Sequence, residues 1–174
     1  NDSFSAADWK REVFRRLGEL VKMAEDADIV LLLENCDGWG SQSPAHLKEL
    51  VEHFSSPAFR VVFDSGNAIA HGGTKEDNWG FYRAALPYLE HFHIKDCLLS
   101  GGGYTMPGEG DCDVEALLRD LNGQGYKGIF SIEPHIAMVI HEDGGASASA
   151  DQAEVYKVYG EKANLLAARA LQTP

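Results

Sequence analysis

The sequence predicts an α/β fold in which helices cover a parallel sheet. Three observations carry this prediction. Short apolar runs alternate along the chain with segments of helical periodicity. The apolar runs lack the polar-apolar alternation of a half-exposed strand, as expected of parallel strands that are buried on both faces. Their ends recur about every 30 to 40 residues, which is the length of successive βα units.

The helices are expected where apolar residues recur with a period near 3.6 or where capping residues mark a boundary. An apolar stripe through residues 7–26 predicts the first helix, and Ser5 with Asp8 resembles a capping box at its start. Ser43 followed by Pro44 predicts a second helix that ends near residue 54. The further expected helices cover residues 79–86, residues 113–122 before Gly123 and Gly125, and an alanine-rich segment from about residue 150.

The strands are expected at the apolar runs between these helices. They cover residues 28–35, 60–64, 89–94 and 128–133. The third run is less apolar than the others, and a glycine-rich loop at 100–110 follows it. Strand and helix alternate throughout, which favours a parallel sheet.

Length, charge and cysteine content limit the classes of protein to which this chain can belong. A chain of 174 residues with 44% hydrophobic residues predicts one domain over residues 1–174. The net charge of −12 disfavours binding to nucleic acid or to anionic membranes. Three cysteines without a CxxC spacing indicate a reducing compartment. No apolar run approaches the roughly 20 residues of a membrane span, so we expect a cytoplasmic protein.

Four strand ends carry side chains that can bind a metal ion. They are Glu34, Asp64, His93 and Glu133. The carboxyl ends of parallel strands lie on one face of a sheet, so we expect these groups to converge. A single carboxylate after a strand is often only a helix cap, but four such groups at equivalent places favour a site. Three oxygens and one nitrogen suit Mn²⁺, Mg²⁺ or Co²⁺, with Zn²⁺ as an alternative.

Five phrases in the chain resemble a known family. They are Leu32-Leu33-Glu34-Asn35, Phe63-Asp64-Ser65-Gly66-Asn67, His91-Phe92-His93-Ile94-Lys95-Asp96, Pro107-Gly108-Glu109-Gly110 and Ser131-Ile132-Glu133-Pro134-His135. In this order they resemble the xylose-isomerase-like TIM-barrel superfamily of sugar isomerases and epimerases. The resemblance implies a (β/α)₈ barrel of the TIM type, of which this chain holds about the last four strand-helix units.

The resemblance also assigns roles to the four ligands. It implies a divalent ion, Mn²⁺ by preference, held by Glu34, Asp64, His93 and Glu133, and it alone excludes His91 as the ligand. Such an ion would acidify the proton beside a substrate carbonyl and stabilise an enediolate. Glu34 and Glu133 would be the catalytic pair that removes and returns this proton, as in ketose epimerases.

Four further residues are candidates for substrate binding, each with a structural alternative. Asn67 matches a substrate-contacting position of the ketose 3-epimerases, or it is a turn residue. Lys95 would neutralise an enediolate or a substrate carboxylate, or it pairs locally with Asp96. His135 would reach a substrate hydroxyl, or loop backbone satisfies it. Glu109 would contact substrate, or it is a solvated loop charge.

The expected function is that of a metal-dependent isomerase or epimerase of a small sugar or keto-polyol. A lyase or dehydratase acting on a keto-sugar or an oxidised glycoside is the first alternative. Leu99 stands where the 3-epimerases carry an arginine, which disfavours tagatose- or psicose-type specificity. A non-catalytic half-barrel that binds metal is the second alternative, and an apurinic-site endonuclease ranks last because the chain is acidic.

The expected half-barrel has consequences for partners. A complete barrel needs about 250 residues, and only four strands are expected here. A half-barrel exposes two sheet edges and an apolar inner face. We therefore expect a missing N-terminal half or a second copy of the chain to cover them, with a small-molecule substrate as the only other partner.

Overall fold

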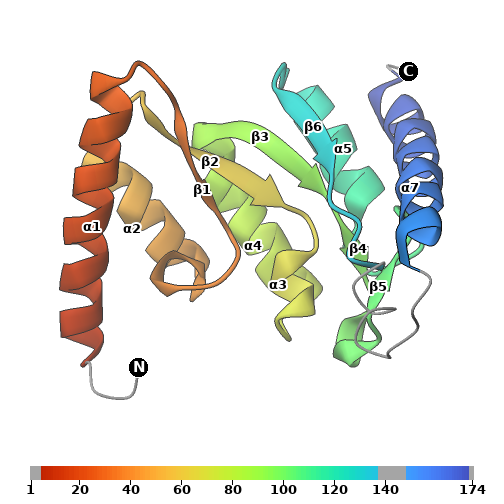
Figure 1. The fold of residues 1–174 in the computed structure, drawn as a ribbon, viewed down its shortest axis with the longest axis horizontal. Coiled ribbons are helices and arrows are strands. Elements are labelled where there is room, and N and C mark those ends of the chain that lie inside the picture. Colours follow the sequence, from red (N-terminus) through yellow and green to blue (C-terminus); the bar gives the residue numbers. More distant parts are fainter. Residues whose placement is uncertain (1–4, 137–147, 173–174) are drawn as a thin grey trace. The chain divides into compact units, whose positions relative to one another are not determined.

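The computed structural model describes residues 5–136 and 148–172 (Figure 1). These residues form two compact units. The first contains the chain up to residue 63 together with residues 80–90, and the second contains residues 64–79 with the chain from residue 91 onward. Among the described helices, none is long and apolar enough to cross a membrane.

Four parallel strands confirm the predicted fold class. They are β1 (Leu31–Glu34), β2 (Phe59–Asp64), β3 (Leu89–Ile94) and β6 (Ile129–Ile132), in the order β1-β2-β3-β6. β1 pairs with β2 so that Glu34 lies opposite Val62. β3 pairs with β6 so that His93 lies opposite Ser131. Helices separate the strands along the chain, as the alternating pattern predicts.

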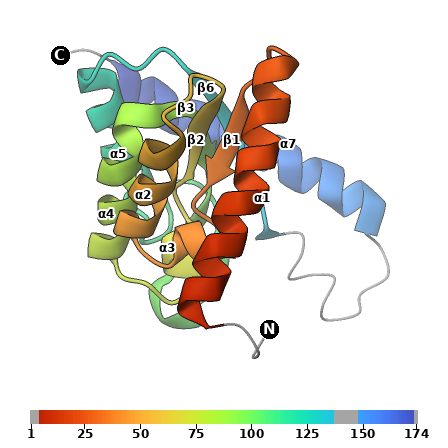
Figure 2. The same ribbon diagram turned by 90° about the vertical axis from the view of Figure 1, so that its left-hand side faces the viewer.

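In the first unit, helices pack on the β1 side of the β1–β2 ladder. α1 (Ala6–Asp26) begins at Ser5, whose hydroxyl accepts the Asp8 N–H, as expected of this cap. α2 (Pro44–Phe54) begins after Ser43, which caps it as predicted. α1 contacts both β1 and α2 (Figure 2). The Phe14 ring meets Phe54 of α2 and Trp39 of a 3₁₀ helix, η1 (Trp39–Ser41), at 6.1 and 5.3 Å.

In the second unit, two helices cover β6. α7 (Ala148–Leu171) packs against α5 (Val114–Gly123) and β6 (Figure 1). The buried side chains of these two helices are Val114, Leu117, Leu118, Leu121, Tyr159, Ala163, Leu166 and Ala170. The Tyr159 hydroxyl donates to the carbonyl oxygen of Ile94 at 3.3 Å, so α7 is also tied to the end of β3.

The remaining elements are short. α3 (Asn67–Ala70) follows β2, and α4 (Lys75–Ala85) precedes the 3₁₀ helix η2 (Leu86–Tyr88). The predicted glycine-rich loop contains the 3₁₀ helix η3 (Leu99–Gly101). The strands β4 (Asp96–Cys97) and β5 (Tyr104–Thr105), of two residues each, form an antiparallel hairpin on either side of η3. Neither the hairpin nor α3 was expected, because elements of two to four residues give no measurable periodicity.

The expectation that the strands are buried on both faces is met by β2 but is wrong for the other three. β2 is buried almost throughout, whereas β1 and β6 are half-buried, β3 has an exposed residue, Glu90, and Ile29 just before β1 is 59% exposed. β1 and β6 are the outer strands of the described sheet order, so each has a neighbouring strand on one side.

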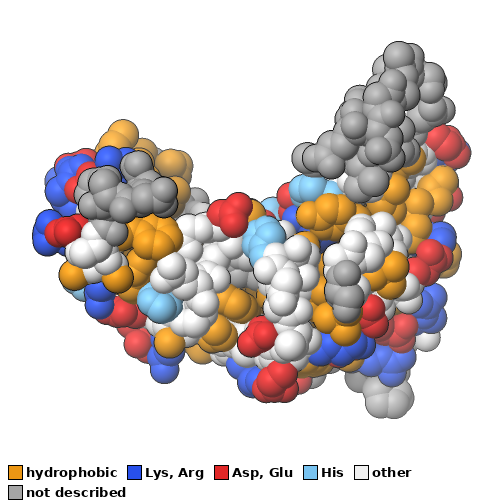
Figure 3. All heavy atoms as spheres, turned by 90° about the horizontal axis from the view of Figure 1, so that it is seen from below, with side chains coloured by type: hydrophobic (Ala, Val, Ile, Leu, Met, Phe, Trp, Pro, Cys, Tyr) orange, Lys and Arg blue, Asp and Glu red, His pale blue; other side chains and the backbone are white. Residues whose placement is uncertain are grey.

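On the face drawn in Figure 3, Lys and Arg side chains are interspersed with Asp and Glu side chains.

Candidate metal centre

Asp64 ends β2 and is completely buried. Its Oδ1 accepts the backbone N–H groups of Gly66 and Asn67, each at 2.8 Å. These bonds satisfy two N–H donors where the chain turns from β2 into α3, but the N-cap residue of α3 is Gly66, so the alternative that Asp64 is only a helix N-cap is wrong. The two bonds engage Oδ1, whereas Oδ2 lies 3.1 Å from Lys95 Nζ and 3.8 Å from His93 Nδ1.

His93 and Glu133 lie beside Asp64 in the second unit. The His93 Nδ1 is 3.1 Å from Glu133 Oε2 and 3.8 Å from Asp64 Oδ2. The Glu133 N–H donates to the Ile94 carbonyl, which continues the β3–β6 ladder and fixes the position of this glutamate. Asp64, His93 and Glu133 each offer one ligand atom within 4.8 Å of the others. Two carboxylates and one imidazole so arranged suit a divalent ion.

Lys95 completes this cluster in the second unit. Its Nζ lies 3.1 Å from Asp64 Oδ2, 2.9 Å from Glu133 Oε2 and 2.9 Å from Asn67 Oδ1. The alternative of a local pair with Asp96 is wrong, because the Asp96 carboxylate accepts the N–H groups of Gly108 and Gly110 instead. Although Lys95 and Asp96 are adjacent in sequence, their side chains therefore have different partners.

The two carboxyl groups of the cluster, Asp64 and Glu133, differ in the direction of their pKa shifts. Burial raises the pKa of Asp64 to about 7, although the charge of Lys95 acts in the opposite direction. Partial burial also disfavours the ionised form of Glu133, but hydrogen bonds with His93 and Lys95 outweigh it and hold the pKa of Glu133 well below its usual range. Near neutral pH, Asp64 therefore takes up a proton far more readily than Glu133, which stays ionised.

The two histidines of β3 have different partners. His91 Nε2 lies 2.8 Å from the Ser131 hydroxyl, whereas His93 faces the two carboxylates. Burial and the neighbouring His93 ring lower the pKa of His91. The resemblance alone excluded His91 as a ligand, and the position of His93 beside Asp64 and Glu133 agrees with that choice.

The remaining substrate-binding candidates lie at different places. Asn67 is buried and accepts from Lys95, so it belongs to the cluster. His135 lies at the edge of the cluster, with Nε2 at 3.7 Å from Glu133 Oε1 and its ring 4.9 Å from that of Tyr104. Glu109 is exposed and pairs with Lys162 of α7, as expected of a solvated loop charge.

Glu34 ends β1 in the first unit. It lies opposite Val62 in the β1–β2 ladder, and Asp64 is two residues further along β2. Asp64 belongs to the second unit, and the role of Glu34 as the fourth ligand stays a prediction.

Two supporting residues escaped the sequence analysis. Ser65 is buried, and its hydroxyl bonds to the backbone of Lys95, which couples the end of β2 to the end of β3. Tyr104 stacks on His135 from the glycine-rich loop. Neither has a sequence signal, because a serine after a strand and a tyrosine in a loop are common.

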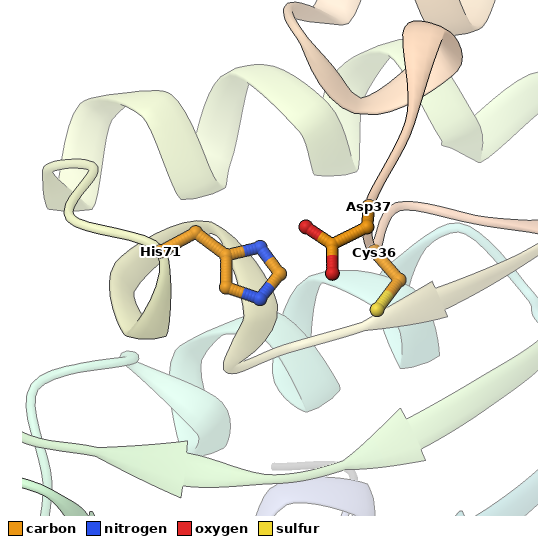
Figure 4. Close-up of side chains that lie close together, drawn as sticks. All are labelled: Cys36, Asp37 and His71. Carbon is orange, nitrogen blue, oxygen red and sulfur yellow. The ribbon is translucent and has the colours of Figure 1, made fainter. Parts of the chain in front are cut away.

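A second group of potential ligands contains a cysteine. Figure 4 shows the side chains of Cys36 and Asp37, from the loop after β1, and of His71, at the end of α3. The first two residues belong to one compact unit and His71 to the other. We assign no metal site to them.

Comparison with known proteins identifies the family. The family model described as xylose isomerase-like TIM barrel matches residues 1–157. An inosose dehydratase of Serratia proteamaculans (strain 568) is 26% identical over 147 residues, which cover 75% of this chain and 49% of that protein. An inosose dehydratase of Bacillus thuringiensis (strain Al Hakam) is 22% identical over 147 residues, with 75% and 48% covered.

Solved structures share the fold. A xylose isomerase domain protein from Planctomyces limnophilus is 25% identical, with a TM-score of 0.65 over 94% of this chain and 56% of that one. A xylose isomerase-like TIM barrel protein from Mycobacterium smegmatis, solved in complex with magnesium, is 19% identical, with a TM-score of 0.67 over 97% of this chain and 53% of that one. The chain spans about half the length of the curated relatives that it matches. It belongs to the xylose isomerase-like TIM barrel family.

Proposed function

We propose that the chain carries the metal-binding half of a dehydratase that acts on a keto-polyol or a related keto-sugar. The observation that carries this proposal is the cluster of Asp64, His93 and Glu133, whose ligand atoms lie within 4.8 Å of one another. Relatives that share this part of the chain are named inosose dehydratase, which favours water elimination over the isomerase or epimerase reaction expected first.

The proposed ion is Mn²⁺, held by Asp64, His93 and Glu133 together with Glu34. Glu34 is proposed as the fourth ligand because it ends a strand with a carboxylate, as Asp64 does, and because the resemblance to the family assigns it that role. When bound, such an ion polarises a substrate carbonyl and makes the neighbouring C–H more acidic.

The chain's own residues would then move the proton. Glu133 is ionised near neutral pH and one of its oxygens, Oε1, lies toward His135, so it can accept the proton from the carbon beside the carbonyl. The electron pair of that C–H bond forms a C=C bond, and the C–O bond at the next carbon breaks. The departing hydroxide takes a proton from His135 and leaves as water.

An isomerase or epimerase remains the second candidate, because it shares the first step. The two reactions differ in the step after proton removal, since an epimerase returns the proton to carbon and a dehydratase expels a neighbouring hydroxyl. The acid and base roles that the resemblance implies for Glu34 and Glu133 would suit the epimerase, because proton return needs a second proton carrier.

The two reactions are distinguished by incubation in D₂O with keto-inositols and ketoses, in Mn²⁺ or in EDTA, followed by mass spectrometry. We expect Mn²⁺-dependent loss of one water from a keto-inositol. Glu133→Gln should abolish it, whereas Glu109→Gln, at an exposed ion pair, should leave it unchanged. Deuterium uptake without water loss would favour the epimerase. Metal binding without any reaction would support the non-catalytic half-barrel.

A further inference from the structure

Lys95 is the most deeply buried cation among the described residues of the cluster. It follows β3, and its side chain is 3% exposed. A buried ammonium group is costly unless its charge and its three N–H donors are satisfied. Here Nζ donates a hydrogen bond to Asn67 Oδ1 at 2.9 Å and lies 3.1 and 2.9 Å from the carboxylate oxygens of Asp64 and Glu133. The ammonium charge is therefore compensated within the cluster, and a contact with substrate would compete with these partners.

The chain builds a dedicated place for this side chain. A Cβ atom at Gly66 would lie 2.7 Å from Lys95 Cγ, so only glycine leaves room for the lysine stem. The Ser65 hydroxyl accepts the Lys95 N–H at 3.0 Å and donates to the Lys95 carbonyl at 2.7 Å. Backbone and side chain of Lys95 are thus both fixed by the segment that ends β2.

The ammonium group contacts the oxygens that a metal ion would need. Asp64 Oδ1 already accepts two backbone N–H groups, which leaves Oδ2 as its ligand atom, and Lys95 contacts this Oδ2. Glu133 Oε2 faces both His93 Nδ1 and Lys95 Nζ. A lysine and a divalent ion would therefore share the same two carboxylates.

We propose that Lys95 is a built-in counter-ion of the metal centre, which neutralises Asp64 and Glu133 and thereby limits how tightly the site binds a divalent ion. The inference rests on the proposed metal site. Two positive groups beside one carboxylate pair repel each other, and the repulsion is strong where water is excluded. Lys95 is accordingly a positioning residue with two effects. It lowers the affinity of the site for metal, and it stabilises the cluster when no metal is bound.

Removing the positive charge of Lys95 should raise metal affinity and lower the stability of the metal-free fold. Without the ammonium group, the buried Asp64 and the half-buried Glu133 lose the cation between them until a metal ion binds. The ion then meets no competing cation. Metal affinity should increase, and the stability of the fold should become dependent on metal.

The test measures Mn²⁺ binding by the electron paramagnetic resonance signal of the free ion, and thermal unfolding in EDTA and in Mn²⁺. We compare the wild-type chain with Lys95→Met, which keeps the stem, and Lys95→Gln, which keeps hydrogen bonding. Both variants should bind Mn²⁺ at least about tenfold more tightly. Both should unfold at a lower temperature than wild type in EDTA and recover in Mn²⁺.

The matched control is Lys75→Met. It removes one positive charge from the same unit at a half-exposed pair with Asp113, and it should bind Mn²⁺ like wild type. A merely structural role of Lys95 predicts weaker binding in its variants, so equal or weaker binding would overturn the inference while leaving the metal site intact. Failure of both variants to fold even in saturating Mn²⁺ would also overturn it. A wild-type chain that binds no Mn²⁺ would overturn the metal site itself.

Discussion

At Asp64, metal binding and protonation compete for one buried carboxyl group. Burial raises the pKa of this group to about 7, and a metal ligand must be deprotonated. We expect the affinity for Mn²⁺ to increase as the pH rises from about 6 to about 8, because the ion no longer has to displace a proton. Calorimetry in two buffers of different ionisation enthalpy should show proton release on binding at the lower pH.

The control for this pH dependence is a carboxyl group whose pKa moves the other way. Hydrogen bonds with Lys75 and Trp79 outweigh partial burial and lower the pKa of Asp113. Asp113 has a positive φ of 56°, a conformation that asparagine tolerates. Asp113→Asn should therefore retain the wild-type pH dependence. An affinity that stays constant between about pH 6 and 8 would contradict the raised pKa of Asp64.

The identity of the site residues was more predictable than their partners. Asp64, His93 and Glu133 stand at strand ends, and parallel topology alone brings such ends together. The sequence could not assign Lys95 to the cluster and Asp96 to the glycine-rich loop, because strand direction and loop path decide which way adjacent side chains point. Glu109 shows the same limit, since its partner Lys162 lies 53 residues away.

Among the elements, the glycine-rich loop after β4 depends on one buried carboxylate. Asp96 accepts N–H groups from Gly108 and Gly110, and a Cβ atom at Gly110 would lie 2.2 Å from Asp96 Oδ1 and 2.6 Å from the Cys97 carbonyl oxygen. Neither neighbour can move without breaking loop hydrogen bonds. Gly110→Ala should lower the free energy of unfolding by about 2 to 3 kcal/mol, measured by urea denaturation.

Gly123 offers the matched substitution. It ends α5, and a Cβ atom there would meet nothing within 4 Å. Gly123→Ala should change the free energy of unfolding by less than about 1 kcal/mol. If the two alanine variants were equally stable, the contact between Asp96 and the glycine-rich loop would not determine the loop conformation.

Helix starts that carry a capping residue were easier to predict than other boundaries, whereas α4 begins at Lys75, four residues before its predicted start. Ser5, Ser43 and Pro44 mark helix starts because each residue type satisfies or omits a specific backbone donor. The first strand was predicted three residues too long at its start, because Ile29 and Val30 continue its apolar run although both are exposed. Apolar residues alone do not show whether a position lies within a strand or in the exposed segment next to it.

For the whole molecule, the α/β class followed from the alternation of elements, and the family model confirms it. The chain itself does not identify the cover of the outer strands, because it spans about half the length of its curated relatives. We propose that a further protein segment or a second copy of the chain pairs with them. Half-buried apolar strands without a second neighbour favour such pairing.

This proposal predicts that a charge on an outer strand changes association. Within the described residues β6 pairs with β3 alone, and Ile129 of β6 is 66% exposed. Ile129→Lys should reduce concentration-dependent self-association in sedimentation velocity, because a buried strand pairing cannot accept an unpaired ammonium group. Leu165→Lys places the same charge at a residue of α7 that is 63% exposed, and it should leave association unchanged. Equal effects of the two variants would indicate that the change in surface charge, rather than pairing at the strand, controls association.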